Sequence, residues 1–262
     1  MNPVERLGAA VRAAIQEFCI VAALLWTSAA VALRPDTWRA SVQWVLSRQI
    51  YFTGVQAIPI VVGIAVLLGT SIVLQAQVWL LDAGQSAWIG PFLVASLLRE
   101  IAPLVVNIVV LLRSGSAIVT ELGNMTVAGE VRVLDGQGID PFHYLVMPRI
   151  LGLSISVLVL TVVFLVVAFT SGYACSVATG VQPAGPMAFM NSVLSAIEAR
   201  DLLVLGCKVL LPAAMTAAIC CREGLSVAPI PTEVPKATMR ALSRAGTALF
   251  VSSLVLSILR YV

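Results

Sequence analysis

The chain has 262 residues, of which 60% are hydrophobic and only 11% are charged. Because a soluble domain has about 25% charged residues, this composition excludes a soluble enzyme, a disordered chain and a disulfide-rich secreted module. The fold class that it predicts is an all-α integral membrane protein. The net charge of +3 gives no indication of a nucleic-acid partner, and we expect none.

The sequence offers little for metal or cofactor binding. Its five cysteines lie in apolar stretches without a CxxC pair, and His143 is the single histidine. Buried thiols acting as small hydrophobic side chains are the better interpretation of these cysteines than metal ligands. A phosphate-binding GxxxxGK[ST] loop is also missing from the sequence. We therefore expect no cofactor in this chain and no ATP hydrolysis by the chain itself.

Residues 1–48 form the first predicted unit, an elbow helix at the membrane interface. The apolar run 18–33 reaches roughly 24 Å as a helix, short of the roughly 30 Å hydrocarbon core. Residues 36–49 contain Trp38, and tryptophan is typical of the headgroup level. This region therefore lies on or dips into one leaflet, with a full span through 18–33 as the alternative.

Residues 49–262 form the second predicted unit, which contains five transmembrane helices. Each has about the 20 apolar residues that a helix needs to cross the hydrocarbon. The predicted spans are about 50–81, 91–112, 150–179, 202–221 and 237–259. Within the first span, Ala65 and Gly69 form a small-xxx-small pair that allows close helix approach.

The basic side chains predict the orientation, because cytoplasmic segments of membrane proteins carry an excess of Lys and Arg. With the N-terminus in the cytoplasm, only Arg200 and Arg260 lie on the outer side. The cytoplasmic set is Arg34, Arg39, Arg48, Arg113, Arg132, Arg149, Arg222, Lys236, Arg240 and Arg244. The C-terminus is then expected on the outer, periplasmic side.

The polar insert 113–149 separates the second and third spans. Apolar residues from Ile118 to Leu134 recur at intervals of three and four, which predicts one helix with an apolar stripe. Glycines after this stripe predict its end, Asp140 predicts the cap of a second short helix, and Pro148 predicts a break before the third span. The insert is interpreted as a docking element for a cytoplasmic partner, with an ordinary helical loop as the alternative.

Motifs in and around this insert resemble those of one permease family. They are Leu97-Leu98-Arg99-Glu100 followed by Pro103, Arg113-Ser114-Gly115, Glu121-Leu122-Gly123-Asn124-Met125, the acidic Glu130, Gly138-Ile139-Asp140-Pro141, and Tyr144 through Arg149. Asp201-Leu202 with Lys208, and Glu233-Val234 with Lys236 and Arg240, follow later in the chain. In this order the motifs resemble the MlaE/YrbE permeases, from about residue 49 to the C-terminus.

The resemblance implies the permease of an ABC transporter in a bacterial inner membrane, with an elbow helix, five spans and a coupling helix between the second and third spans. It implies a homodimer, a separate cytoplasmic ATPase that binds ATP and Mg, and an Mce-domain lipid-binding protein on the outer face. The substrates would be lipids, with phospholipids favoured, moved between inner and outer membranes. The residues that it assigns to ATPase coupling are Glu121, Leu122, Gly123, Met125, Glu130, Asp135, Gly138, Asp140, Pro141 and Arg149.

Ionisable residues within the spans are the other candidate site. Arg99 and Glu100 are adjacent on a helix, so their side chains diverge by about 100°. Lys208 lies at a depth similar to that of Glu100, which predicts a contact between them. Such residues usually face a partner or a cavity. A clamp between helices and a polar rim beside a lipid path both remain open.

A lipid path through the outer part of the first span would be lined by Ile72, Trp79 and Leu80, although ordinary helix packing also explains these residues. Two other functions remain as alternatives. One is a stand-alone carrier or channel that uses Arg99, Glu100 and Lys208. The other is an intramembrane lipid-modifying enzyme that uses His143, but no catalytic motif accompanies this histidine, and a non-enzymatic transport subunit is expected.

Overall fold

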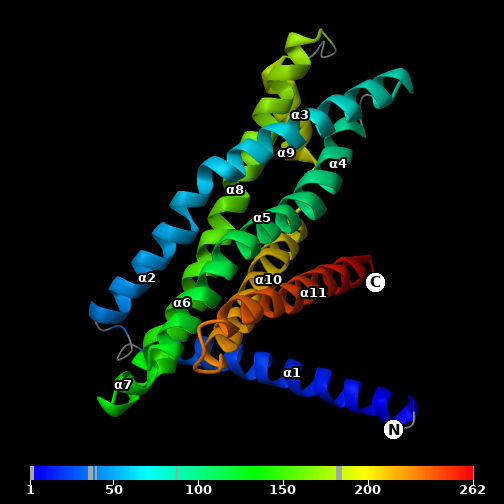
Figure 1. Cartoon of the computed structure of the whole chain (residues 1–262). Helices are drawn as coiled ribbons and strands as arrows, with labels where there is room; N and C mark the ends of the chain where they lie inside the picture. The colour runs from blue at the N-terminus through cyan, green and yellow to red at the C-terminus, as the bar shows by residue number, and fades with distance from the viewer. Residues whose placement is uncertain (1–2, 35–37, 39, 86–87, 181–184, 262) are drawn as a thin grey trace.

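The computed structural model describes residues 3–34, 38, 40–85, 88–180 and 185–261, which form helices and connecting turns without a strand. Five helical segments are long and apolar enough to cross a membrane: Ala40–Asp82, Ile89–Val127, Phe142–Ala178, Ala199–Leu225 and Glu233–Arg260. The predicted all-α architecture with five spans is therefore confirmed. Figure 1 shows α6 and α7 at one end of the bundle and α9 at the opposite end, and these are called the α7 end and the α9 end below.

The N-terminal helix α1 (Pro3–Ala32) precedes the spans and lies across the α7 end in Figure 1. Its apolar part, Cys19–Ala32, is too short to count among the five spanning segments. The elbow interpretation therefore fits α1 better than a sixth span does. The indole Nε1 of Trp38 donates a hydrogen bond to the carbonyl of Ala32 at 3.0 Å, which folds the chain back after α1.

The first span consists of α2 (Ala40–Thr53), a 3₁₀ turn (Val55–Ala57) and α3 (Ile58–Asp82). The chain is helical about ten residues before the predicted start of this span, and α2 runs through the predicted boundary between residues 48 and 49. Hydropathy misses this extension because polar residues continue the helix beyond the apolar stretch.

The second span contains two π-helical interruptions. It runs through α4 (Ile89–Leu93), the π-helical segment η4 (Val94–Ile101), α5 (Ala102–Val110), the π-helical segment η5 (Leu111–Gly115) and α6 (Ser116–Val127). Such π turns are rare and frequently mark functional sites in helices. The segment η4 carries Arg99 and Glu100, so the predicted intramembrane charges lie on this irregular backbone.

The insert after the second span differs from its prediction. The helical stripe is broken at Gly129, whose φ of 78° is left-handed, so that α6 ends before it and the short helix α7 (Glu130–Gly136) starts after it. The prediction of one continuous helix is wrong, because the apolar periodicity continues across the turn. Residues 113–127 extend the second span instead of forming a separate block.

The third span also differs from its prediction. The π-helical segment η6 (Phe142–Val146) leads directly into α8 (Met147–Ala178). Asp140 caps this segment as predicted, because its Oδ1 accepts a hydrogen bond from the Phe142 N–H at 2.9 Å. The predicted break at Pro148 is wrong: the helix runs without interruption from η6 through Pro148 into α8, and the π-helical turns lie just before the proline.

The remaining helices are α9 (Pro186–Ser195), α10 (Ala199–Leu225) and α11 (Glu233–Tyr261). Helix α8 is central, because it packs against α2, α3, α5 and α10. Its Leu160 and Phe164 are among the most buried residues of the chain. The predicted close approach in the first span is present, since a Cβ on Gly69 would lie 2.4 Å from the carbonyl oxygen of Ala168 in α8.

Replacing Gly69 by Ala is expected to lower the free energy of unfolding by about 1–3 kcal/mol, because the added methyl group must push α3 away from α8. Gly63 provides a matched control on the same helix, because a Cβ there meets nothing within 4 Å. Gly63→Ala should instead raise the free energy of unfolding by about 0.5–1 kcal/mol through helix propensity. Thermal unfolding of the purified protein measures both, and equal shifts would contradict the packing described here.

Candidate functional site

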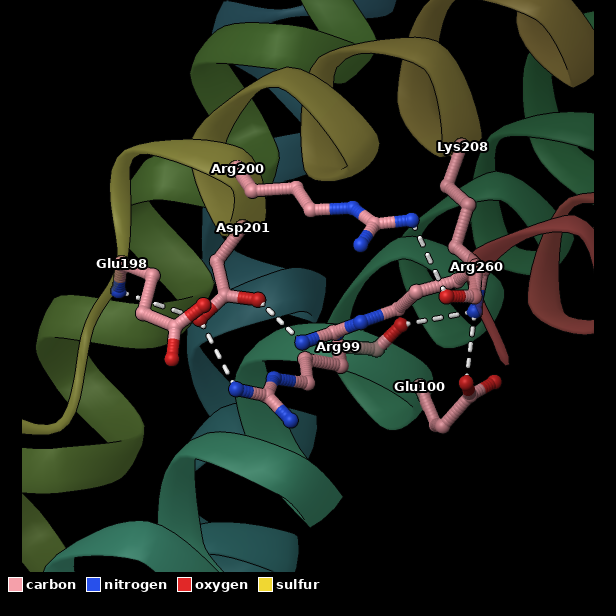
Figure 2. A network of polar contacts seen from close by, with 7 residues as sticks. All are labelled: Arg99, Glu100, Glu198, Arg200, Asp201, Lys208 and Arg260. Carbon is pink, nitrogen blue, oxygen red and sulfur yellow. Dashed lines mark hydrogen bonds and ion pairs between the residues drawn. The ribbon is translucent and has the colours of Figure 1, made fainter. Parts of the chain in front are cut away.

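A network of charged side chains joins the second, fourth and fifth spans. Figure 2 shows Arg99 and Glu100 from η4, Lys208 from α10 and Arg260 from α11 converging near the start of α10. In Figure 1 this start of α10 lies between the centre of the bundle and the α9 end. Ionisable residues at such positions cost several kcal/mol unless they are paired.

Asp201 accepts two guanidinium groups from different spans. Its Oδ2 accepts a hydrogen bond from Arg99 Nη2 at 2.9 Å, and its Oδ1 forms an ion pair with Arg260 Nη2 at 2.5 Å. The side chain of Asp201 has no exposed surface. It also completes a capping box with Glu198 in the first turn of α10, where a carboxylate is favoured by the helix dipole. Asp201 therefore ties both arginines to the start of α10.

Lys208 forms the second half of the network. Its Nζ donates to Glu100 Oε1 at 2.6 Å and to the carbonyl oxygen of Arg99 at 3.0 Å. Pro103 explains why that carbonyl is available, because proline has no N–H to donate to the carbonyl four residues earlier. Ser257 of α11 donates to Glu100 Oε2 at 3.1 Å. The predicted contact between Glu100 and Lys208 is confirmed, and Lys208 satisfies a backbone group that the irregular helix leaves free.

The five charged groups at the centre of the network are Arg99, Lys208 and Arg260 against Glu100 and Asp201, so one positive charge is left over. The network is also partly open: the side chain of Glu100 is 43% exposed and that of Arg99 is 20% exposed, whereas Lys208 is buried. The arrangement can fix three helices relative to one another and still present charge at its open side. Both readings of these residues, a clamp and a polar rim, are therefore compatible with the geometry.

The sequence pattern does not reveal that Asp201 joins Arg99 to Arg260. It places Asp201 in a family motif and Arg260 among the outer charges. A carboxylate three residues after Glu198, at the start of an apolar run, is a signal for a helix N-terminus. The pairing of that N-terminus with Arg99 and Arg260 depends on how three helices pack, which the sequence pattern does not contain.

A double-mutant cycle tests the second half of the network. Glu100→Gln and Lys208→Met are each expected to lower the unfolding temperature, and Lys208→Met more strongly, because it also leaves the Arg99 carbonyl without a donor. The free energy of unfolding of the double variant should fall by less than the sum of the two single losses, and the difference gives a coupling energy of about 0.5–3 kcal/mol. Additive losses would show that the two side chains do not interact in the folded protein.

The coupling residues predicted on the insert fall into two groups. Glu130, Asp135, Gly138 and Asp140 are exposed at the α7 end, and Pro141 is partly buried beside them. His143 Nδ1 lies 2.6 Å from Asp140 Oδ2 on the same surface. No residue of α7 itself is buried. These residues form the part of the predicted docking element that a partner can reach, and it is called the α7 tip below.

The other predicted coupling residues support the helix packing behind the α7 tip. Leu122 and Gly123 are buried, and a Cβ on Gly123 would lie 3.2 Å from Val234 Cγ1. Met125 is partly buried against the core. Arg149 is buried, and its Nη2 lies 3.1 Å from Glu121 Oε2, which joins α6 to α8.

The residues predicted to line a lipid path differ in how far they are exposed. Trp79 is 66% exposed on α3, whereas Ile72 and Leu80 are partly buried and pack against the core. None of the three lines a groove of about 560 Å³ that α1, α8 and α10 form. Among the described residues no cluster of three or more His, Cys, Asp or Glu side chains is placed to hold a metal ion.

The comparison with known proteins decides the family. The model of the family described as Permease MlaE matches residues 46–259, which is most of the chain and includes the α7 tip and every residue of the network except Arg260. The chain belongs to the MlaE permease family. The family resemblance noted from the motifs is therefore confirmed, and its extent agrees with the predicted one.

Individual relatives agree with this membership. A probable ABC transporter permease protein of Synechocystis sp. is 29% identical over 81% of this chain and 80% of its own length. The intermembrane phospholipid transport system permease protein MlaE of Haemophilus influenzae is 30% identical over 48% of this chain and 49% of its own. Protein TRIGALACTOSYLDIACYLGLYCEROL 1, chloroplastic, of Arabidopsis thaliana is 27% identical over 84% of this chain and 61% of its own. This MlaE-family chain is thus a multi-pass membrane protein of the ABC transporter permease type.

Proposed function

We propose that this chain is the membrane subunit of an ABC transporter that moves phospholipids between the inner and outer membranes of a bacterium, with ATP hydrolysed by a separate cytoplasmic ATPase. The observation that carries the proposal is the family match over residues 46–259, together with the Haemophilus relative that is named for intermembrane phospholipid transport. A transport subunit of this kind is not itself an enzyme.

The distribution of charge supports an orientation with the α7 end in the cytoplasm. Arg113, Arg132 and Arg149 belong to the helices of that end, whereas Arg200 and Arg260 lie at the network. Basic residues near the ends of spans favour the cytoplasmic side. The N-terminus then lies in the cytoplasm, and the C-terminal end of α11 lies toward the periplasm.

The α7 tip is the surface that supports an ATPase as partner. Of its exposed acidic residues, Glu130 and Asp135 stand on the short helix α7, which follows the left-handed turn at Gly129, and Asp140 lies just before η6. A short helix at the end of two long spans can pass a push from a bound ATPase into both of them. ATP and Mg belong to that partner.

Further partners are proposed from the resemblance and from α11. This helix is the least buried of the five spans. Its exposed apolar residues include Phe250, Val251, Leu254, Val255, Ile258 and Leu259. Such a face suits a second copy of the chain or lipid, and we propose a homodimer with a lipid cavity near its axis. An Mce-domain lipid-binding protein would receive or deliver lipid on the periplasmic face.

Reconstituted vesicles test the proposed function. The complex isolated from native membranes is placed in vesicles with a labelled phospholipid, and transfer of the label to an acceptor is measured with and without ATP. We expect transfer to require ATP and to stop when a nonhydrolysable analogue replaces it. Transfer that continues at the same rate without ATP would contradict the proposal and favour a stand-alone carrier.

Two variants sharpen this test. Under the proposed function, the unaltered chain and His143→Ala both leave the lipid chemically unchanged. A chemically altered lipid that the unaltered chain produces and His143→Ala does not would favour the enzyme alternative. Glu130→Lys should reduce ATP-dependent transfer by changing the α7 tip alone. Glu121→Lys is less informative, because it places a lysine against the buried Arg149 and so disturbs folding as well as docking.

A further inference from the structure

A cavity of about 450 Å³ lies at the α7 end between α2, α6 and the start of the third span. It shares no residue with the network of Figure 2. Its polar and aromatic lining includes Trp44 and Arg48 of α2, Glu121 of α6, Tyr144 of η6 and Arg149 of α8. This volume falls within the range typical of sites for small molecules and headgroups.

Two guanidinium groups face this cavity, and only one of them has a carboxylate partner. Arg149 pairs with Glu121 at 3.1 Å and donates from Nη1 to the Leu145 carbonyl at 2.9 Å, while its buried Nε has no hydrogen-bond partner among the described residues. Arg48 is exposed, lies 5.5 Å from the centroid of the Trp44 ring, and pairs with no carboxylate in the described part of the chain. The cavity therefore carries a net positive charge that an anion would neutralise.

The apolar side of the cavity lies on the exposed surface of the first span. Trp44 is 61% exposed and Phe52 is 36% exposed, and both belong to the first span, Ala40–Asp82. Arg113 lies beside Phe52, with its guanidinium carbon 4.9 Å from the ring centroid and its Nη1 donating to the Phe52 carbonyl at 2.7 Å. Arginine and aromatic side chains at one level are typical of the boundary between headgroups and acyl chains.

We propose that this cavity binds the phosphate of an anionic phospholipid from the cytoplasmic leaflet, with Arg48 and Arg149 as its cationic groups and an acyl chain along Phe52. Basic pockets between spanning helices on the cytoplasmic side bind such headgroups. The inference rests on the orientation given under the proposed function, but it requires no transport. A lipid held there contacts α2, α6 and α8 together, and so stabilises the elements behind the α7 tip.

Native mass spectrometry of the purified full chain in mild detergent tests the site. The chain is mixed with phosphatidylglycerol or phosphatidylethanolamine, and the retained lipid is counted. We expect more phosphatidylglycerol than phosphatidylethanolamine to be retained. Because one basic side chain contributes about fivefold to such binding, Arg48→Gln should weaken retention about fivefold and Arg48→Glu about twenty-five-fold. Arg48→Lys should keep it.

The control is Arg12→Glu, an equal charge reversal on the exposed surface of α1. It should leave phosphatidylglycerol retention unchanged. An equal loss in Arg12→Glu would show a general charge effect and overturn the site, as would unchanged retention in Arg48→Glu. Displacement of the lipid by millimolar inorganic phosphate would show a site for free anions instead of lipid.

Two further measurements, of co-purified ATPase and of ATP-dependent transfer, distinguish the lipid site from a protein contact and from the proposed function. If Arg48→Glu lowers the amount of co-purified ATPase and leaves lipid retention unchanged, the cavity is a protein contact and the lipid proposal is overturned. ATP-dependent transfer measured on the same preparations separates the two proposals. If the unaltered chain transfers lipid with ATP but retains no phosphatidylglycerol at this cavity, only this inference is refuted. If the unaltered chain shows no ATP-dependent transfer, the proposed function is refuted.

Discussion

Replacing Asp201 by Asn is expected to lower the free energy of unfolding by about 3–5 kcal/mol, because it leaves two arginines inside the bundle without their carboxylate. Asp201 is the only described residue that pairs with both Arg99 and Arg260. It also closes the capping box at the start of α10. Denaturant or thermal unfolding of the purified protein in detergent measures the change.

The matched control for this variant is Asp82→Asn at the exposed end of α3. It removes the same charge and should change the free energy of unfolding by no more than about 0.5 kcal/mol. If Asp201→Asn yields no folded protein, Arg99→Gln and Arg260→Gln supply the test, because each leaves Asp201 with one partner. Each should be milder than Asp201→Asn, and equal stability of Asp201→Asn and Asp82→Asn would contradict the network.

If the proposed ATPase binds at the α7 tip, replacing Gly129 by Ala is expected to weaken its binding about tenfold. The φ of 78° at Gly129 turns the chain between α6 and α7, and a residue with a Cβ loses roughly 1–2 kcal/mol in this conformation. Helix α7 would then be displaced while the spans stay intact. Co-purification of the ATPase with the tagged chain measures binding, and the unfolding temperature reports on the spans.

The control for this second variant is Gly136→Ala at the end of α7. Gly136 has no positive φ and a Cβ there meets nothing within 4 Å, so alanine fits this helical position without strain. ATPase binding should remain unchanged in Gly136→Ala. Loss of binding in both variants would mean that the surface of α7, and not the turn before it, determines the effect. A large fall in unfolding temperature in Gly129→Ala would instead place the defect in the spans.

Much of the fold was predictable because the membrane imposes a simple rule on the sequence. A helix that crosses the hydrocarbon needs about 20 apolar residues, and the predicted spans appear within the observed helices. Helix ends were less predictable, since the polar residues of α2 and α6 continue the helices beyond the apolar windows. The turn at Gly129 escaped prediction because the same apolar spacing appears on both sides of it.

Contacts in the candidate site were predictable only where the depth of two side chains in the membrane was sufficient to bring them together. Glu100 and Lys208 lie at similar depths on two spans, and this was sufficient to predict their contact, which the structure contains at 2.6 Å. The pairing of Arg99 with Asp201 depends on where the start of α10 packs. The pairing of Arg260 with Asp201 depends on where the end of α11 packs. Neither could be derived before the packing of these helices was known. The role of Pro103 in freeing a carbonyl for Lys208 likewise depends on the three-dimensional contact.

Isolation of the tagged chain from its native membrane in mild detergent, with mass spectrometry of everything retained, tests the central claim most directly. The proposed function predicts a P-loop ATPase at a ratio of one to one with this chain, and phospholipid in the same sample. Loss of the ATPase from the Gly129→Ala sample, with its retention in the Gly136→Ala sample, would place the contact at the α7 tip. Recovery of the chain without an ATPase in several detergents would contradict an ABC transporter and favour a stand-alone carrier.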